Sequence, residues 1–458
     1  MNIERQIKDF RREREWLYTL ITDPKGERFF IEKTHETLQK QFQEGLVRMA
    51  AFLDFAGNPH TQFRSVHVAG TSGKGSVTTM VAALLTACGQ RTADHTSPYL
   101  QLALEKLRVD GQMIAPSAFA QLIRDFRAWY EKWQAEGKTL KYGEAWVFLT
   151  FFWFAQQQLD WAVIETGMGG RYDPTNVLES ELSIITNVDL DHIKSLGKTI
   201  PEIAWHKAGI IKPKQRVVTA ATKVETLRVI SAEVSTQNAT LQHVNLANDL
   251  SITARFNRYT LAGLPLKSHY QRINAATAIT AVDWLAHDFG FALSDNAIQT
   301  AFTNLESPGR FEIMQENPTI ILDGAHNPHK VAALVDSIKR AYPDKKLWVQ
   351  AGMIVGKSAE PILHSLLPIS KHLILSQPKV IGKPPQPLTK LHTLAITQLP
   401  NHPISLFPHV QDGITHFLTH AAPDDILLIT GSIYLIGEAR ERWYPSTQML
   451  QTLVEQSS

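Results

Sequence analysis

The stretch SVHVAGTSGKGSVTTMVAALLTA, residues 65–87, decides the fold of this chain. It begins with a short β-rich run at 65–69, continues through a glycine-rich turn from residue 70 and ends in an apolar helix expected at 76–87. A strand, a loop and a helix in this order place free amide hydrogens at the positive end of the helix, which is a site for anions. The stretch therefore predicts an α/β domain with a phosphate-binding loop.

The loop reads GTSGKGS, and its residue types suit the phosphates of a nucleotide. Its glycines let the backbone approach phosphate oxygens, while Lys74 can neutralise the oxygens of the β and γ phosphates. Ser76 or Thr71 can reach the magnesium ion that accompanies ATP. The residues expected to bind the nucleotide are Gly70, Thr71, Ser72, Gly73, Lys74, Gly75 and Ser76.

This loop departs from the common nucleotide-loop pattern GxxxxGK[ST]. Val68 stands where the first glycine of that pattern belongs, and Gly75 separates Lys74 from Ser76. A flexible glycine turn between two core elements is the alternative interpretation. The position of the loop between a strand and a helix favours the anion site.

Further short apolar runs follow the loop, and helix-like segments separate them. The expected strands lie at residues 65–69, 161–165, 182–187 and 216–220 and, after Ser307-Pro308-Gly309, at 319–323, 347–351, 373–376, 404–407 and 426–430. This alternation predicts mostly parallel sheets covered by helices, and the chain length favours more than one domain. We expect two α/β domains, residues 1–306 and 307–458, with helices over the first 60 or so residues and a buried helix at 146–155.

The composition of the 458-residue chain excludes several classes of protein. Basic and acidic residues number 46 and 44, so the formal charge of +2 gives no general attraction to nucleic acid or to anionic membranes. Cys88 is the single cysteine, which excludes an intramolecular disulfide and a cysteine-cluster metal site and fits a reducing cytosol. The charged start, MNIERQIKDFRRERE, lacks the apolar core of a secretory signal, and the apolar run at 146–155 is half the roughly 20 residues of a membrane span. We expect a cytoplasmic protein with no nucleic-acid or membrane partner.

Nine motifs resemble, in the same order along the chain, those of the folylpolyglutamate synthase and dihydrofolate synthase family, within the Mur ligase superfamily. They are HVAGTSGKGSV (67–77), TSPYL (96–100), IETGMGGRYDPTNV (164–177), ITNVDLDH (185–192), HKAGIIK (206–212), HYQRINAATA (269–278), PGRFEIM (308–314), ILDGAHNPH (321–329) and ITGSIYLIGEAR (429–440). The resemblance covers roughly residues 45–445. It implies a P-loop central domain of the Mur ligase type with a mostly parallel sheet, and a smaller Rossmann-like α/β domain at the C-terminal end.

The family reaction makes an amide from a carboxylate and the α-amine of L-glutamate. A free carboxylate is a poor electrophile, so the γ-phosphoryl group of ATP is first transferred to it, and the amine then attacks the acyl phosphate. Charge has to be stabilised at both steps, which calls for clustered metal ligands and cations. The resemblance implies an ATP- and magnesium-dependent ligase, expected to be a monomer, that adds L-glutamate to a reduced folate, to dihydropteroate, or to both.

Glu165 ends an expected strand, so its carboxylate can project from the carboxyl edge of a parallel sheet, where such sheets place ligands. This position suits a magnesium ligand, and a solvated strand-end acid is the alternative. By resemblance, Ser97 and His192 are further magnesium ligands, although His192 taken alone would be an ordinary capping or core histidine. The resemblance also implies that Lys207 is carbamylated and helps to bind a second magnesium ion; carbamylation turns a cation into an oxygen donor, which suits a hard metal. An unmodified Lys207 would be a phosphate partner or a surface lysine.

The second domain contributes the DGAHNP turn, which follows a strand and faces the interdomain cleft. By resemblance, Asp323 and His326 of this turn act on the nucleotide or on the incoming glutamate. Arg310 reaches across to an ATP phosphate, for which its planar, permanently charged fork is suited, and Asn274 contacts the adenine end. The alternative for Arg310 is a surface ion pair. Ser432 is a candidate for the glutamate pocket, and a helix N-cap is the simpler explanation for it.

Several positions depart from the family pattern. Tyr99 replaces the histidine of the common TSPHL, and Gly143 replaces an aromatic residue. Gly356 and Ser358 stand where an Asp-Lys-Asp pattern is common, and Ser72 replaces an asparagine but keeps its capacity for hydrogen bonds. Ser72 can still bind ATP, and the other changes lie outside the residues expected to bind ATP. The departures therefore bear on the acceptor rather than on the class of reaction.

Two other functions are compatible with the pattern. The same chemistry would act on a non-folate carboxylate acceptor, as relatives in cell-wall synthesis do, or the chain would be a catalytically silent nucleotide-binding module. The complete set of metal and transfer residues argues against the silent module. Because the phosphate loop and the DGAHNP turn belong to different domains, catalysis is expected to require domain closure about residues 305–310.

Overall fold

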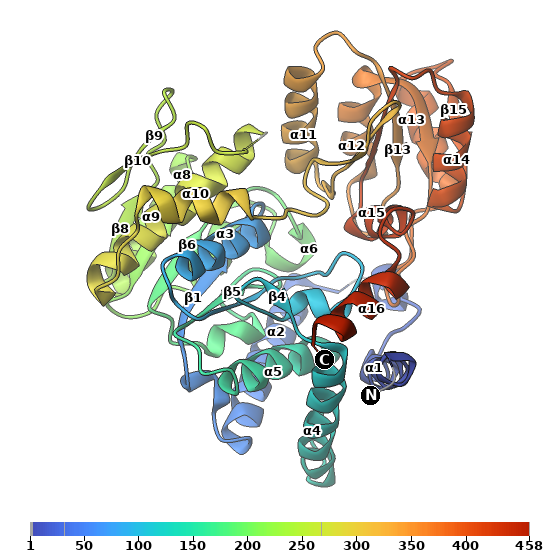
Figure 1. The fold of residues 1–458 in the computed structure, drawn as a ribbon. Helices are drawn as coiled ribbons and strands as arrows, with labels where there is room; N and C mark the ends of the chain where they lie inside the picture. Colours follow the sequence, from blue (N-terminus) through green and yellow to red (C-terminus); the bar gives the residue numbers. More distant parts are fainter. Residues whose placement is uncertain (1–2, 32, 267, 458) are drawn as a thin grey trace.

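The computed structural model describes residues 3–31, 33–266 and 268–457. These residues form an eight-stranded sheet, a six-stranded sheet and a two-stranded ribbon. The two large sheets belong to separate halves of the molecule, and the chain passes between them after helix α10 (Asp295–Thr303) (Figure 1). The expectation of two successive α/β layers with mostly parallel strands is confirmed.

The first sheet has the strand order β4-β3-β2-β5-β1-β6-β7-β8. The strands from β2 to β8 in this order are parallel, and β3 and β4 form an antiparallel edge. Because β1 is central, the loop that follows it is flanked by the carboxyl ends of β5 and β6. The strands are β1 (Arg64–Ala69), β2 (Thr92–His95), β3 (Arg108–Val109), β4 (Gln112–Met113), β5 (Trp161–Glu165), β6 (Leu182–Ile185), β7 (Arg216–Thr219) and β8 (Thr240–His243).

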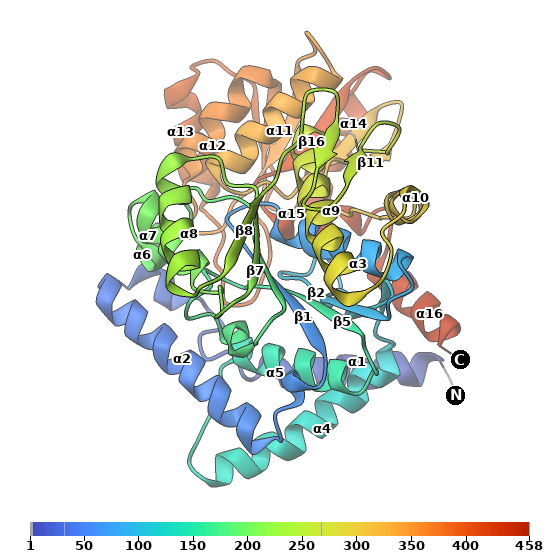
Figure 2. The same ribbon diagram turned by 90° about the vertical axis from the view of Figure 1, so that its left-hand side faces the viewer.

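Both faces of this sheet are covered by helices, because each strand places buried residues on alternate sides (Figure 2). One face carries α3 (Lys74–Ala87), α9 (His269–Phe289) and α10. The other face carries α1 (Ile3–Tyr18), α2 (His35–Phe55), α4 (Pro116–Ala135), α5 (Tyr142–Ala155), α7 (Ile200–Ala208) and α8 (Val224–Thr236). The smaller elements are η1 (Glu27–Phe30), η2 (Pro59–Thr61), η3 (Ala103–Lys106), η4 (Pro174–Val177), α6 (Ile193–Leu196) and the ribbon of β9 (Ser251–Thr253) and β10 (Arg258–Thr260).

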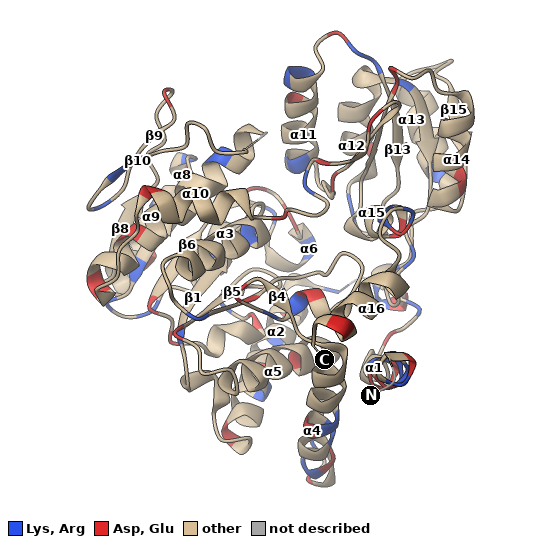
Figure 3. Cartoon of the chain, viewed as in Figure 1, with Lys and Arg blue, Asp and Glu red and all other residues tan. Residues whose placement is uncertain are grey.

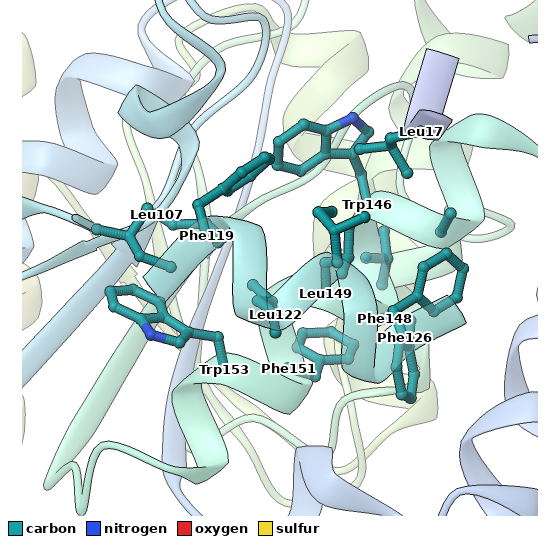
Figure 4. Packing of buried hydrophobic residues seen from close by; sticks show 14 of the residues in the cluster. Leu17, Leu107, Phe119, Leu122, Phe126, Trp146, Phe148, Leu149, Phe151 and Trp153 are labelled. Carbon is teal, nitrogen blue, oxygen red and sulfur yellow. The ribbon is translucent and has the colours of Figure 1, made fainter. Parts of the chain in front are cut away.

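The expected buried helix at 146–155 is the greater part of α5, which lies at the centre of an aromatic core (Figure 4). Phe148 of α5 packs edge-on against Phe52 of α2, with the ring centroids 4.8 Å apart. Trp146 and Phe126 are also buried in this cluster. Replacing one such buried aromatic side chain by alanine costs about 3–5 kcal/mol of stability, so this core fixes the N-terminal helices to the sheet.

The helical prediction for the first 60 or so residues is correct for α1 and α2 but misses the break between them. The chain turns at Pro24-Lys25-Gly26, where Gly26 has a left-handed backbone with φ of 72°. The resulting loop lies against the second half of the molecule, because Gly382 donates a backbone hydrogen bond of 2.8 Å to the carbonyl oxygen of Pro24. This contact ties the N-terminal segment to the C-terminal half.

The second sheet has the order β11-β12-β16-β13-β14-β15, and β11 alone among these described strands runs antiparallel to its neighbour. Helices α11 to α13 cover one face, and α14 and α15 cover the other. The elements are β11 (Glu312–Gln315), β12 (Thr319–Leu322), α11 (Pro328–Ala341), β13 (Leu347–Ala351), α12 (Ala359–Leu366), η5 (Leu367–Ile369), β14 (Ser370–Leu375), α13 (Leu388–Gln398), β15 (Ile404–Leu406), α14 (Val410–His420), β16 (Ile426–Thr430) and α15 (Ile433–Arg440).

The last helix, α16 (Ser446–Gln456), leaves the second half and packs against α1 and α4 (Figure 1). Its Leu450 and Val454 are buried in the aromatic core of the first half. The two described ends of the chain therefore lie near one another (Figure 2). The domain division at residues 306 and 307 remains a prediction.

Acidic and basic residues are distributed over both halves (Figure 3). Among the described helices, none combines the length and the apolar character that crossing a membrane requires.

Candidate active site

The loop after β1 is held by the segment that follows β6. Thr71 donates its backbone amide to the carbonyl oxygen of Asn187 at 2.8 Å, and Ser72 donates its amide to Asn187 Oδ1, also at 2.8 Å. Thr186 Oγ1 donates to the carbonyl oxygen of Ser72 at 2.7 Å. Thr186 and Asn187 therefore fix the loop, a role that the sequence analysis did not assign to them although their motif had been noted.

Helix α3 begins at Lys74, two residues earlier than the strand-and-helix pattern predicted. Gly73 makes this possible, because it takes a left-handed N-cap conformation with φ of 84°. A side chain at this position would also meet Asn274, since a Cβ atom would lie 2.5 Å from its Oδ1. The amides of the first helical turn thus open into the site, where they can bind an anion.

Glu165 ends β5 beside this helix and is 5% exposed. Its Oε1 lies 3.7 Å from Lys74 Nζ, and its Oε2 accepts a 2.9 Å hydrogen bond from the backbone amide of Ser97. Burial raises the pKa of Glu165, whereas Lys74 and the Ser97 amide oppose this rise. The predicted metal ligands Glu165 and Ser97 are therefore adjacent to the lysine of the phosphate loop.

Lys207 approaches the loop from the other side. It is 3% exposed, and its Nζ donates a 2.7 Å hydrogen bond to the carbonyl oxygen of Gly70. Burial, followed by the charge of Lys74, lowers the pKa of Lys207 well below its ordinary value. Lys207 is consequently not a surface lysine, and its environment favours an uncharged amine.

His192 lies at the rim of the same site. It has a left-handed backbone with φ of 50°, its side chain is 43% exposed, and its Nε2 is 3.9 Å from Asp191 Oδ2. Lys74 and Lys207 are within electrostatic range of its ring. The structure thus brings His192 to the edge of the Lys74–Glu165 site with its ring open to a ligand.

The DGAHNP turn of the second half faces this site. Asp323 is 4% exposed and accepts hydrogen bonds from the amides of Ala325 at 2.8 Å and Phe311 at 2.9 Å, and from Tyr270 Oη of α9 at 3.2 Å. Burial raises the pKa of Asp323. Because Tyr270 belongs to the first half, Asp323 takes part in the contact between the two halves.

His326 and Arg310 complete the part of the site that comes from the second half. His326 Nδ1 lies 2.9 Å from the carbonyl oxygen of Gly324, and its Nε2 lies 3.4 Å from Lys330 Nζ. Arg310 Nη1 donates to the carbonyl oxygen of Gly309 at 3.0 Å, and its charge acts on Glu165 and Lys330. Arg310 therefore lies within electrostatic range of Glu165, and His326 lies beside Lys330. Their contacts with ATP and with glutamate remain predictions.

Asn274 and Ser432 have well-defined local partners. Asn274 lies against Gly73 of the loop and donates to Gln271 Oε1 at 2.9 Å. Ser432 is the N-cap of α15, where its Oγ accepts a 3.2 Å hydrogen bond from the Tyr434 amide. The simpler explanation for Ser432 thus accounts for its hydroxyl, while contacts of Asn274 with adenine and of Ser432 with glutamate remain predictions.

Three basic and acidic residues of the site were not assigned a role by the sequence analysis. Two of them form an ion pair, in which Asp191 Oδ1 lies 3.1 Å from Lys357 Nζ of the second half. The third is Lys330, whose pKa is lowered to about 7 by burial and next by the charge of Lys74. Lys330 lies in the first turn of α11, where the helix dipole disfavours a cation. A lysine at such a position is a sequence signal for an anionic ligand.

The site is suited to a nucleotide triphosphate. Three cations, Lys74, Lys330 and Arg310, converge on it beside the buried amine of Lys207. The carboxylates that act on these four groups are Glu165, Asp173, Asp191 and Asp323. In the described part of the chain, Ser72 Oγ and Thr166 Oγ1 are buried beside the loop without a hydrogen-bond partner. Clustered cations and free hydroxyl groups suit the binding of phosphate oxygens.

The same residues fit a divalent metal only in part. The described residues contain no cluster of three His, Cys, Asp or Glu side chains arranged to hold a metal ion. The expected set of Ser97, Glu165, His192 and Lys207 contains one carboxylate. A hard cation would need further oxygen atoms, which ATP phosphates and a carbamate on Lys207 can supply.

Comparison with known proteins agrees with this arrangement. A Mur ligase middle domain matches residues 68–282, and a Mur ligase glutamate ligase domain matches residues 309–433. The dihydrofolate synthase/folylpolyglutamate synthase of Bacillus subtilis is 31% identical over 426 residues, which cover 89% of this chain and 97% of that protein.

Solved structures show the same relationship. The folylpolyglutamate synthase of Mycobacterium tuberculosis, complexed with ADP and AMPPCP, has a TM-score of 0.78 at 29% identity and covers 87% of this chain and 95% of its own. A bifunctional folylpolyglutamate synthase/dihydrofolate synthase with manganese, AMPPNP and L-glutamate bound has a TM-score of 0.75 at 25% identity, over 87% and 94% of the two chains. The fold and the site thus define an ATP-dependent ligase of the Mur ligase type. Within this class, the chain belongs to the folylpolyglutamate synthase and dihydrofolate synthase family.

Proposed function

We propose that this enzyme joins the α-amine of L-glutamate to a carboxylate of a reduced folate, of dihydropteroate, or of both, through an acyl phosphate formed from ATP. The observation that carries the proposal is the Lys74–Glu165 contact of 3.7 Å, made where Arg310 and Lys330 of the second half reach the first. One site then holds triphosphate, acceptor and amine together. The relatives of this chain carry the corresponding activities in their names.

The residues divide the chemistry between the two halves. The amides at the start of α3 and Lys74 would bind the β and γ phosphates, and Arg310 and Lys330 would stabilise the charge that develops on the transferred phosphoryl group. His326, held through its Nδ1 by the Gly324 carbonyl, presents Nε2 to the site, where an uncharged imidazole can accept a proton from the attacking amine. Closure of the halves would exclude water from the acyl phosphate.

We further propose magnesium as the divalent cation, with two ions held by Ser97, Glu165, His192 and a carbamylated Lys207. When bound, magnesium would neutralise phosphate oxygens and polarise the phosphoryl group. The buried, largely uncharged amine of Lys207 supports carbamylation, because carbon dioxide reacts with the free amine. Since the site is complete within one chain, we propose a monomer, and the single cysteine is consistent with action in the cytoplasm.

The test is phosphate release from ATP by the purified protein. Release is expected only when a pteridine acceptor and L-glutamate are both present. Release that depends on another carboxylate acceptor would remove the folate assignment and leave the ligase assignment in place. Release that needs no acceptor at all would contradict both.

A further inference from the structure

Two lysines from opposite halves of the molecule lie within electrostatic range of each other next to the site, and neither has a carboxylate partner among the described residues. Lys106 ends η3, and its Nζ lies 4.2 Å from the centroid of the Trp146 ring. Lys383 lies in the loop after β14, where it donates a hydrogen bond to Tyr434 Oη and sits 4.8 Å from the centroid of that ring. Neither ammonium group has a carboxylate within 4.0 Å in the described part of the chain.

Helix α15, which carries Tyr434, lies beside the segment before η3, since Arg440 Nη1 of α15 donates to Gln101 Oε1 at 2.7 Å. The charge of Lys383 thereby acts on Lys106. Burial, followed by the charge of Lys383, lowers the pKa of Lys106 to about 7, and Glu165 opposes this effect. Both side chains are partly buried. Like charges in a partly buried site raise the free energy of the protein, and an anion bound between them would relieve this repulsion.

The position of the pair separates it from the phosphate-binding cations. The carbonyl oxygen of Lys106 lies 3.1 Å from His95 Nδ1, and His95 is in register with Ile164, the residue before Glu165. Lys106 therefore lies beside the strand end that carries Glu165. Its electrostatic neighbours are Lys383 and Glu165 rather than Lys74.

The surroundings of the pair are aromatic. Trp146 lies beneath Lys106, Tyr434 lies beneath Lys383, and Tyr142 is within electrostatic range of Tyr434. Aromatic faces hold an ammonium group in place without neutralising it, so its charge remains available to a ligand. They also provide apolar contacts for the methylene or ring portion of an organic carboxylate.

We propose that Lys106 and Lys383 together bind a carboxylate of one of the two organic substrates, beside Glu165. This inference rests on the proposed function, in which both L-glutamate and the acceptor bring carboxylates into the site. Because Lys106 belongs to the first half and Lys383 to the second, the subsite is complete only when the halves are together. The hydrogen bond from the Gly382 amide to the Pro24 carbonyl oxygen holds the loop of Lys383 against the N-terminal segment.

The variants Lys106→Met and Lys383→Met test the subsite in the full-length enzyme. Loss of one charge-assisted contact is expected to raise KM for the carboxylate substrate about 10- to 100-fold. KM for ATP is expected to stay within about twofold, because the phosphate-binding cations are intact. Lys106→Arg and Lys383→Arg should restore most of the affinity, which a purely structural role of the lysines would not predict.

Lys379→Met is a matched control, since Lys379 lies in the same loop but is 63% exposed and 3.8 Å from Glu438. It is expected to leave both KM values unchanged. A rise confined to KM for L-glutamate assigns the carboxylate to the incoming amino acid, and a rise confined to KM for the pteridine acceptor assigns it to the acceptor. If both KM values stay within about twofold in both methionine variants, the subsite does not exist.

Direct binding separates this inference from the proposed function. Calorimetry with a non-hydrolysable ATP analogue measures the affinities for L-glutamate and for the acceptor without turnover. A wild-type protein that binds one of them through Lys106 and Lys383 but releases no phosphate would overturn the proposed function alone. A wild-type protein that binds neither carboxylate would overturn the subsite as well.

Discussion

Asp191 of the first half and Lys357 of the second form an ion pair across the active site, with Oδ1 and Nζ 3.1 Å apart and both side chains less than 15% exposed. Burial acts to raise the pKa of Asp191, but His192 and Lys357 outweigh it, so the pKa is lowered and the carboxylate is charged. Asn327 Nδ2 lies 3.4 Å from the second oxygen of Asp191. Because Asp191 precedes His192, closure of the halves also positions a predicted metal ligand.

Removing this ion pair should slow the enzyme by depopulating the closed arrangement. Lys357→Met is expected to lower kcat about tenfold, since it leaves Asp191 partly buried without its cation. Small-angle scattering of the nucleotide-bound variant should show a larger radius of gyration. Lys345→Met, which breaks an exposed pair with Asp424, is the control and should keep full activity. An unchanged kcat in Lys357→Met would remove the role in closure.

Gly73→Ala should impair nucleotide binding beyond its effect on stability. The new Cβ would lie 2.5 Å from Asn274 Oδ1 on a backbone with φ of 84°, so the loop has to shift. Gly57→Ala provides the control, because Gly57 has φ of 83° and its Cβ would meet nothing within 4 Å. Both variants should lose about 1–2 kcal/mol of stability from backbone strain, measured by denaturant unfolding. KM for ATP should rise only in Gly73→Ala, and equal KM values would show that the fit of the loop against Asn274 is unimportant.

Lys74→Ala should abolish turnover without unfolding the chain. Lys74 Nζ is the closest described cation to Glu165, and its loss removes a charge expected to stabilise the transferred phosphoryl group. We expect a fall in kcat of at least about 100-fold, with the thermal unfolding midpoint little changed. Normal phosphate release by this variant would exclude the loop from catalysis.

Metal removal should abolish activity, and Glu165→Gln should weaken the response to magnesium. A chelator is expected to stop phosphate release, which added magnesium should restore. The concentration of magnesium for half-maximal activity should rise at least about tenfold in Glu165→Gln, because the carboxylate is the one strong oxygen ligand predicted from the protein before any modification of Lys207. Glu179→Gln, on the exposed surface, should titrate like the wild type. Unchanged titration of Glu165→Gln would exclude Glu165 as a metal ligand.

Acid should destabilise the second half through His372, which stacks on Trp348 with the ring centroids 4.2 Å apart. Burial, and next the charge of His416, lower the pKa of His372 from its ordinary 6.5 to about 4. Between these values the unfolded chain binds a proton here that the folded chain does not, so the free energy of unfolding falls as the pH drops from about 6.5 to about 4. His372→Gln should therefore lose less thermal stability than the wild type between about pH 7 and about pH 5. Equal losses would contradict this assignment.

The features that depend on nearby residues were predictable from the sequence. The strand that ends at Ala69, the loop after it and the placement of Glu165 at a strand end follow from apolar runs and glycines that lie close together in the chain. The predicted start of α3 is two residues too late, because the apolar pattern that predicts the helix does not include Lys74 and Gly75. The two-residue strands β3 and β4 are too short to give any periodicity.

The contacts between the halves could not be predicted in the same way. In the sequence, Lys357 stands out only because Gly356 and Ser358 flank it in place of two aspartates. Its partner Asp191 lies 166 residues away. Lys106 and Lys383 likewise become neighbours only through the relative placement of the two sheets. Such pairs depend on the orientation of whole domains, about which local composition carries no information.

Helix α16 returns the chain to the first half, and we expect it to limit how the two halves can separate. The chain leaves the first half after α10 and returns to it through α16, whose Leu450 and Val454 are anchored among aromatic side chains. The six-stranded sheet is consequently attached to the first half at both of its ends. We expect its movement to be a rotation about the line that joins the two crossings. Products would leave during this rotation. Cutting the chain just before α16 would remove one of the two attachments, so the axis of the rotation would no longer be fixed.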